Sequence, residues 1–243
     1  EHLLSVVQGD GRQILTSLEV ACALARVRDR SNVNVNVSDV EGAISSSALR
    51  YGRDDHYDVV SAFIKSVRGS SVDAALHWLA RMLVAGEDPR FIARRLVILA
   101  SEDIGMADPN ALTQTLAAWD TYDRLGSPEG ELAIAQAVIY LGTAPKSNAG
   151  YVAFGAAKRS AKEHGSLTPP MHILNAPTKL MKEIGYGSGY QYDHNAEDGF
   201  SGQNYFPDGM ARQQFYQPVE RGFEREILKR LEYWKKLRDK RSK

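Results

Sequence analysis

The sequence predicts an all-α protein, and three observations carry this prediction. Apolar residues recur at spacings of three and four along most of the chain, which is the period of one face of an α-helix. Connections of only a few residues separate these periodic stretches, as in helical bundles. Pairs of the type Asp-Pro or Ser-Pro stand where helices would begin, because the first side chain can cap the helix and proline suits its first position. These pairs are Asp88–Pro89, Asp108–Pro109 and Ser127–Pro128.

The first expected helix follows the glycines Gly9 and Gly11. In it Ile14, Leu18 and Cys22 recur every four residues, which places them on one helical face. Cys22 is the only cysteine, so the chain forms no internal disulfide and no cysteine-based metal cluster. We expect it to pack as a small apolar residue.

A second helix is expected after a short extended piece. Valine alternates with asparagine over residues 33–37, which favours an extended backbone. Ser38 and Glu41 have the spacing of a capping box, so a helix should begin there. The polar residues 45–56 are interpreted as a linker between two parts of the chain.

From Tyr57 onward the helical periodicity is clearer. The first helix of this part should end near Gly69, which we expect to take the left-handed conformation after its last turn. Each helix should bury one apolar face against its neighbours. In chain order the expected faces are Tyr57, Val60, Ile64 and Val67; Val72, Leu76, Leu79 and Leu83; Ile92, Leu96 and Leu99; Leu112, Leu116 and Trp119; Leu132, Ala135 and Ile139; and Tyr151, Phe154 and Ala161.

The last third of the chain differs in composition. Residues 169–218 are rich in Gly, Pro, Tyr and Phe, and only residues 178–184 have a helical pattern. Because of its aromatic residues, we expect this segment to wrap a helical surface and to pack its rings onto it, within the chain or between copies. A charged helix over residues 219–238, with a basic tail, should follow. Acidic residues mixed into this helix favour a solvated face over a nucleic-acid contact.

Composition excludes some functions and leaves others open. Thirty basic and thirty acidic residues cancel, so net charge gives no argument for binding nucleic acid or membranes. No apolar stretch approaches the ~20 residues that span a bilayer, and no secretory signal is visible. The chain has no initiating methionine and begins in a helical pattern, so we expect it to be a piece of a longer protein.

Established catalytic motifs are absent from the sequence. It contains no phosphate-binding G-x-x-x-x-G-K-[ST] loop, no G-x-G-x-x-G, no G-x-S-x-G and no H-E-x-x-H. No two histidines have the spacing of a metal-binding pair on one helix. The chain alone is therefore expected to be non-catalytic, and no metal ligands are predicted.

Four basic residues are the candidates for contacts with DNA phosphates. Lys65 and Arg68 precede a Gly-Ser turn, where the N-terminus of the next helix would add a favourable dipole. Their alternative role is to complement the negative end of their own helix. Arg94 and Arg95 could bind phosphate or a neighbouring subunit, and the alternative is a solvated helix face. Sequence alone does not decide between these roles.

Several long strings resemble one protein family. "DGRQILTSLEV" is similar to the start of the lid of AAA+ clamp-loader-like ATPases, in which a Gly-Asp-x-Arg turn opens a helix. "YDVVSAFIKSVRGSSVDAALHWLARMLVAGEDPRFIARRLVILASEDIGMADPNAL", "GELAIAQAVIYLGTAPKSNA" and "NAPTKLMKEIGYG" resemble the C-terminal part of the RarA/MgsA family, to which the Werner-helicase-interacting proteins are related. The resemblance extends from residue 9 to the "QPVERGFE" string.

This resemblance implies a function and an architecture. Family members are DNA-dependent ATPases of stalled replication forks and recombination, and they form homotetramers. Residues 1–50 would be part of the lid, and residues 51–243 would be the helical tetramerisation domain. Arg12 would be the sensor that reaches the γ-phosphate of ATP. ATP and Mg²⁺ would bind only in the full-length protein. Fork DNA and single-stranded-DNA-binding protein would be partners, in the cytoplasm at the nucleoid.

Two readings of another class remain open from the residues themselves. The chain could be a stand-alone helical module that binds proteins or DNA without an ATPase domain. A G-x-x-x-x-G-K-[ST] motif upstream of Glu1 would favour the ATPase, and its absence would favour the module. An independent hydrolase is poorly supported, because no nucleophile and base are paired in the sequence.

Overall fold

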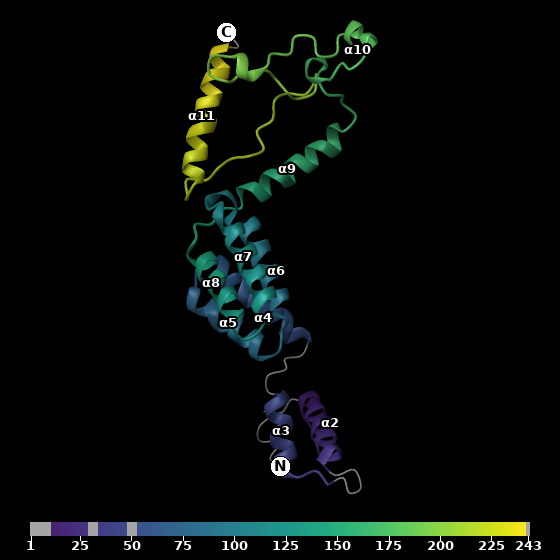
Figure 1. Ribbon diagram of the computed structural model, residues 1–243, viewed down its shortest axis with the longest axis vertical. Coiled ribbons are helices and arrows are strands. Elements are labelled where there is room, and N and C mark those ends of the chain that lie inside the picture. Colours follow the sequence, from purple (N-terminus) through teal and green to yellow (C-terminus); the bar gives the residue numbers. More distant parts are fainter. Residues whose placement is uncertain (1–10, 29–33, 48–52, 242–243) are drawn as a thin grey trace. The chain divides into compact units, whose positions relative to one another are not determined.

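The chain is helical throughout its regular structure, as the sequence predicts. The computed structural model describes residues 11–28, 34–47 and 53–241, and every regular element in these ranges is a helix (Figure 1). The α-helices are α2 (Gly11–Arg28), α3 (Val37–Ser47), α4 (Arg53–Arg68), α5 (Val72–Val84), α6 (Pro89–Leu99), α7 (Asn110–Leu125), α8 (Glu131–Thr143), α9 (Ala149–His164), α10 (Lys179–Ile184) and α11 (Glu224–Arg241). A π-helical segment, η1 (Ala100–Ile104), and three 3₁₀ segments, η2 (Gly105–Ala107), η3 (Met171–Ile173) and η4 (Asp193–Asn195), complete the set.

The helices form two compact units. One comprises Glu1–Val97 with Gln114–Thr143, and the other comprises Ile98–Thr113 with Ala144–Lys243. The predicted division of the chain between residues 50 and 51 lies within residues 48–52, which are outside the described residues, so it stays a prediction.

Helices α2 and α3 pack against each other through small residues. Ala21, Ala25 and Ala43 are their buried apolar side chains among the described residues, whereas Leu18 is exposed and Cys22 is half-buried. The face predicted from Ile14, Leu18 and Cys22 is therefore wrong at Leu18, because alanines allow the two helix backbones to approach. The side chain of Ile14 is outside the described residues.

The cap of α3 lies two residues before the predicted one. The Asn36 side chain accepts a hydrogen bond from the backbone N–H of Asp39 at 2.9 Å, and the Asp39 side chain accepts one from the N–H of Asn36 at 2.9 Å. This reciprocal pair is a capping box, so Asn36 and Asp39 replace the predicted Ser38 and Glu41. Since Val37 is already helical, the described part of residues 33–37 forms no strand.

The first unit has its core between α4, α5 and α8, with contributions from α6 and α7. Phe63, Met82, Ile92, Leu96, Ile134 and Leu141 are fully buried there. Burying a side chain of this size contributes roughly 1.5–3 kcal/mol to folding. The buried residues of α7 are instead small or polar at most positions, namely Ala111, Thr115, Ala118 and Tyr122.

Several predicted apolar faces point to solvent in this chain. On α7 Leu112 and Leu116 are exposed, and on α8 Leu132 is 75% exposed and Ile139 is also exposed. The faces of α7 and α8 that were predicted to be buried are therefore wrong. Each helix is rotated about its axis, so that a neighbouring face is buried instead. Periodicity identifies an apolar stripe, but a helix with apolar residues on several sides leaves the choice of buried face to its neighbours.

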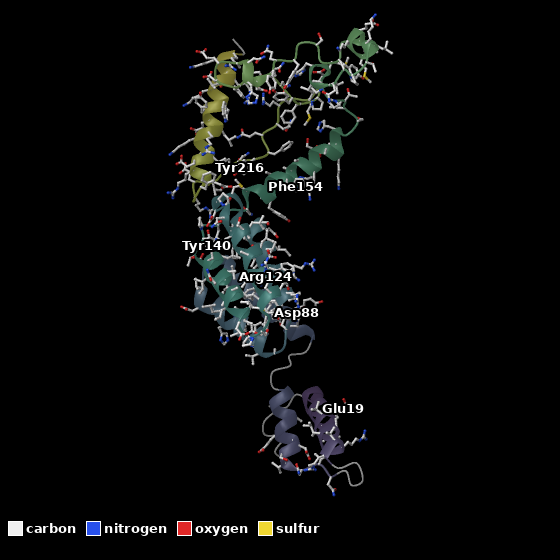
Figure 2. All side chains as sticks on the ribbon, viewed as in Figure 1. Glu19, Asp88, Arg124, Tyr140, Phe154 and Tyr216 are labelled. Atoms are coloured by element: carbon white, nitrogen blue, oxygen red, sulfur yellow. The ribbon has the colours of Figure 1, made fainter. Side chains whose placement is uncertain are left out.

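Two of the three predicted helix starts are confirmed. The Asp88 side chain (labelled in Figure 2) accepts a hydrogen bond from the N–H of Arg90 at 2.9 Å, and Pro89 is the first residue of α6. Asp108 does the same for the N–H of Asn110 at 3.1 Å, at the start of α7. The third is wrong, because Ser127 and Pro128 lie in a turn and α8 begins only at Glu131.

In the second unit a long segment, in which α10, η3 and η4 are the short helical elements, leads from α9 to α11. The ring of Phe200 packs against Trp234 of α11, with 5.0 Å between the centroids. The guanidinium groups of Arg238 and Arg241 lie 5.3 Å and 5.8 Å from the centre of the same ring. The prediction that aromatic residues of this segment pack onto a helix is thus confirmed for Phe200, within one chain.

Candidate functional site

The first pair of candidate DNA contacts lies at the end of α4. Lys65 and Arg68 belong to the last turn of this helix and are exposed. The backbone N–H of Ser71 donates to the carbonyl of Ser66 at 2.9 Å, and the N–H of Ser70 donates to that of Val67 at 3.1 Å. These two bonds form a Schellman motif, which fixes the turn between α4 and α5.

The left-handed residue of this turn is Ser70 and not the predicted Gly69. Ser70 has a φ of 58°, whereas Gly69 does not have a positive φ. A non-glycine residue in this conformation costs free energy that surrounding structure must offset. The turn therefore presents Lys65 and Arg68 on a defined backbone, as a contact with phosphates would require.

The second pair lies in the middle of α6 and differs in its surroundings. Arg94 is exposed, and Arg95 is half-buried with its guanidinium 5.0 Å from the ring centre of Phe91. This distance is in the range of a cation–π contact. Arg94 is thus more accessible to a phosphate than Arg95. The two pairs stand on different helices, and the role of all four residues in DNA binding stays a prediction.

The predicted nucleotide sensor, Arg12, is the second residue of α2. Its side chain is outside the described residues, so its role stays a prediction. No group of three or more His, Cys, Asp or Glu residues in the described part of the chain could hold a metal ion. Within the same part, none of the helices combines the length and apolar character required to cross a membrane.

The most concentrated polar site of the second unit was not predicted, and it is centred on Glu224. This side chain is fully buried, at 0% exposure. Its Oε2 atom accepts hydrogen bonds from the Ser147 hydroxyl at 2.7 Å and from the Val219 N–H at 2.8 Å. Its Oε1 atom accepts one from the hydroxyl of Tyr216 at 2.8 Å (Tyr216 is labelled in Figure 2). Both carboxylate oxygens are therefore satisfied, as burial of such a group requires.

Backbone bonds bring these partners together. The N–H of Ser147 donates to the carbonyl of Asp103 in η1 at 2.8 Å, and the N–H of Phe223 donates to that of Ala107 in η2 at 2.7 Å. Gly222 allows the backbone at Phe223 to lie this close to Ala107. It has a φ of 51°, and a Cβ atom at this position would collide with the carbonyl oxygen of Ala107 and come within 2.6 Å of Pro145. Only glycine tolerates such a close backbone contact with positive φ.

Burial changes the acid–base properties around Glu224. The pKa of Tyr216 is raised, first by burial, then by its hydrogen bond to Glu224 and by the negative charge of that carboxylate. The pKa of Lys146 is lowered by burial, an effect that the negative charge of Asp103 opposes. Since Glu224 and Ser147 are both buried, the cluster holds the start of α11 to the segment before α9.

Sequence reasoning missed Glu224 because nothing local distinguishes it. It lies in the first turn of a helix rich in charges, where a solvated glutamate is the ordinary expectation. The one usable signal is Gly222, two residues earlier, because a glycine before a helix start can mark a close backbone approach.

Comparison with known proteins identifies matches along nearly the whole chain. The family described as "MgsA AAA+ ATPase C terminal" matches residues 69–235, and the family described as "AAA C-terminal domain" matches residues 1–68. Two proteins named "Replication-associated recombination protein A" are similar. The one from Coxiella burnetii is 45% identical over 241 residues, which cover 98% of this chain and 54% of the relative. The one from Escherichia coli is 45% identical over 233 residues, which cover 94% of this chain and 52% of the relative.

A more distant relative comes from a eukaryote. The protein named "ATPase WRNIP1" from Dictyostelium discoideum is 34% identical over 235 residues, which cover 89% of this chain and 27% of the relative. The chain spans about half the length of its two bacterial relatives. The matches are thus to one continuous part of longer proteins.

Proposed function

This chain belongs to the MgsA family of AAA+ ATPases, and from that membership we propose that it supplies the lid and the oligomerisation domain of a DNA-dependent ATPase. The proposed ATPase acts in replication-fork maintenance and recombination. The match of the C-terminal family over residues 69–235 carries the proposal, together with relatives whose names state a role in replication-associated recombination. ATP and Mg²⁺ would be bound by the full-length protein.

Arg12 is the proposed sensor for the nucleotide. A guanidinium that reaches the γ-phosphate stabilises the negative charge that spreads over the phosphate oxygens during transfer. Its position supports this role, because Arg12 stands in the first turn of α2, directly after Gly11, the first residue of that helix. The arginine would act on a nucleotide bound by residues outside this chain.

Exposed apolar surface supports the proposed homotetramer. An apolar groove of about 530 Å³ lies between α5 and α8, and Leu76, Leu83 and Leu132 line it. On α9 the side chains of Tyr151 and Phe154 are also exposed (Phe154 is labelled in Figure 2). Exposed apolar side chains of this kind are typical of protein interfaces and are costly to leave in water.

DNA and single-stranded-DNA-binding protein are the proposed partners, in the cytoplasm at the nucleoid. Lys65 and Arg68 are the favoured phosphate contacts in this chain, since both are exposed on one turn of α4. Arg94 is a further candidate on α6, and Arg95 is a weaker one because its guanidinium lies against Phe91.

The sensor is tested in the full-length protein by the substitution Arg12→Ala. ATP turnover should fall about 10-fold or more, as expected when a charge-stabilising group is removed from phosphoryl transfer, while assembly is unchanged. Arg26→Ala is the matched control, because Arg26 is exposed on the same helix. Normal turnover by the Arg12→Ala protein would contradict the sensor role.

Oligomerisation is tested on this chain itself by light scattering at micromolar concentration. The expected mass is that of a tetramer, and a strict monomer would contradict the oligomerisation role. The chain alone should show no ATP turnover, since it contains no phosphate-binding loop.

A further inference from the structure

The segment between α9 and α11 in the second unit lines a cavity that opens to solvent and has no part in the proposed function. Its volume is about 730 Å³, within the range of small-molecule sites. Residues of η3, of α10 (labelled in Figure 1) and of the glycine-rich turn after α10 line it, together with Tyr205. We name it the tyrosine cavity, after three of its lining residues, Tyr186, Tyr190 and Tyr205; His172 and Lys182 also line it.

Local interactions hold the walls of the tyrosine cavity in place. The hydroxyl of Thr178 accepts a hydrogen bond from the N–H of Met181 at 3.2 Å and caps the start of α10. Gly185 ends that helix with a φ of 101°. The N–H of Gly187 then donates to the carbonyl of Met171 in η3 at 2.9 Å, which ties the glycine-rich turn back to the opposite wall.

Gln203, two residues before Tyr205 in the sequence, is bound to the chain just after the same turn. The side chain of Gln203 accepts a hydrogen bond from the N–H of Gln191 at 3.0 Å and donates one to the carbonyl of Gly189 at 2.9 Å. The Tyr205 hydroxyl donates to the Asp193 carboxylate at 3.0 Å, which fixes the ring from its far end. The cavity is therefore preformed, although most of it is built without regular helices.

The cavity offers aromatic surface to a ligand. Tyr190 and Tyr205 are 47% and 44% exposed, and the rings of Tyr205 and His172 are 6.4 Å apart between centroids. Exposed aromatic rings in an ordered segment are typical of binding surfaces, since each ring has a large apolar face. A flat aromatic ligand would cover that face by stacking.

The charge of the cavity is positive. Among its lining residues none is acidic, and Lys182 makes no ion pair with any residue in the described part of the chain. The Asp193 carboxylate is already bound by the N–H of Ser201 at 2.7 Å and by Tyr205. An anionic ligand would thus meet uncompensated positive charge.

We propose that the tyrosine cavity binds one nucleotide, whose base stacks on the tyrosine rings and whose phosphate contacts Lys182. Stacking of bases on aromatic side chains beside a cationic groove is the general mode of single-stranded nucleic-acid binding. Single-stranded DNA is the source that the proposed function implies, and the inference rests on that function for this choice. A free nucleotide has the same chemistry.

The test is fluorescence anisotropy of a fluorescein-labelled oligothymidylate titrated with the chain. Tyr205→Leu should weaken binding roughly 5-fold or more, as expected for loss of one stacked base, and Tyr190→Leu should do the same. Tyr205→Phe should bind more tightly than Tyr205→Leu, because the ring remains although the bonds of the hydroxyl to Asp193 and Ser201 are lost. Tyr192→Leu is the matched control, since Tyr192 is exposed in the same segment and does not line the cavity.

The phosphate contact has its own pair of variants on α10. Lys182→Ala should weaken binding and reduce the dependence of log Kd on log salt by about one. Lys179→Ala should change neither, because Lys179 lies outside the cavity and pairs with Glu183 at 3.8 Å. Thermal unfolding of each variant shows that it is folded.

Thymidine monophosphate added as a competitor distinguishes the two sources. Displacement of the oligonucleotide at similar concentrations assigns the cavity to a free nucleotide, and failure to displace it assigns the cavity to single-stranded DNA. Both outcomes support a nucleotide site if Tyr205→Leu and Tyr190→Leu bind weakly. Normal binding by both variants overturns the inference, even if Lys65 and Arg68 prove to be DNA contacts. Absence of any binding by the unmodified chain also overturns the inference. The proposed ATPase function is unaffected by that result, because the Arg12→Ala experiment tests it separately.

Discussion

The hydroxyl of Ser147 donates a hydrogen bond of 2.7 Å to the carboxylate of Glu224, 77 residues later in the chain, and both side chains are buried. This bond links the segment before α9 to the first residue of α11. A buried carboxylate is stable only with its partners in place, because an unpaired charge in a low-dielectric interior is costly. The second unit therefore depends on residues that are far apart in sequence.

Glu224→Ala should destabilise the chain by about 2–4 kcal/mol. The substitution removes the acceptor of the buried Ser147 hydroxyl and of the half-buried Val219 N–H, and each lost partner costs ~1–3 kcal/mol. Urea unfolding monitored by circular dichroism measures the change in the free energy of unfolding.

Glu226→Ala is the control on the same helix. Glu226 is exposed and forms a surface ion pair with Lys229 at 2.8 Å, so its removal should leave the stability nearly unchanged. Equal effects of the two substitutions would show that Glu224 acts through helix α11 alone and not through its buried hydrogen bonds.

Tyr216→Phe tests the pH dependence of the same cluster. The folded pKa of Tyr216 lies above its ordinary value of 10.0. A raised folded pKa means that the neutral hydroxyl stabilises the fold fully below about pH 10 and that this contribution is lost as pH rises toward the folded pKa. Below pH 10 the unmodified chain should exceed the Phe variant in stability by ~1 kcal/mol.

Urea unfolding from about pH 8 to about pH 12 checks this sign. The stability difference between the two proteins should be constant up to about pH 10 and should shrink above it. A difference that grows with alkaline pH would contradict the raised pKa of Tyr216. Taking the difference removes the titration of the other tyrosines, which is common to both proteins.

Gly222→Ala should be among the most destabilising single substitutions of the second unit. The added Cβ atom would collide with the carbonyl oxygen of Ala107 and with Pro145, in addition to the strain of a positive φ. A loss above ~3 kcal/mol is expected, measured as a fall in the midpoint of thermal unfolding.

Gly209→Ala separates the collision from the backbone strain. Gly209 also has a positive φ, of 83°, but no atom lies within 4 Å of a Cβ placed there. It should cost only ~1 kcal/mol, the penalty for a left-handed alanine. If Gly222→Ala and Gly209→Ala lower the stability equally, close packing does not explain why residue 222 is a glycine.

Lys65→Ala and Arg68→Ala test the proposed DNA contacts of α4. Each substitution should weaken DNA binding equally for all sequences and lower the slope of log Kd against log salt by about one, because one released counterion is lost per phosphate contact. Lys229→Ala is the control, since Lys229 is an exposed lysine already paired with Glu226. Unchanged salt slopes in both variants would indicate that Lys65 and Arg68 complement the negative end of helix α4 and do not contact DNA phosphates.

Helix starts could be predicted from the sequence where the cap is local. Asp88 and Asp108 cap α6 and α7 as predicted, because each bond joins residues two positions apart. The same reasoning failed at α3. There the capping box is formed by Asn36 and Asp39 and not by the predicted Ser38 and Glu41. When two capping pairs overlap, the sequence pattern does not rank them.

The buried face of a helix was predicted less successfully than its first residue. Leu116 on α7 and Leu132 on α8 belong to regular apolar stripes and are exposed, whereas Thr115 and Ile134 beside them are buried. These helices carry apolar residues on more than one side, so periodicity alone leaves two choices. Of the candidate site residues, Lys65, Arg68 and Arg94 are exposed as a contact requires, and Arg95 is half-buried against Phe91.

By itself the sequence determined that this protein is helical, where α6 and α7 begin, and which family it resembles, because these features depend on neighbouring residues and on long continuous strings. Only the tertiary structure decided which face each helix buries, that Glu224 is the buried residue of α11, and that Tyr205 joins the turn after α10 to form a cavity. The physical reason is that burial is set by elements that meet in space, as Ser147 and Glu224 do, and a local pattern carries no record of its distant partner.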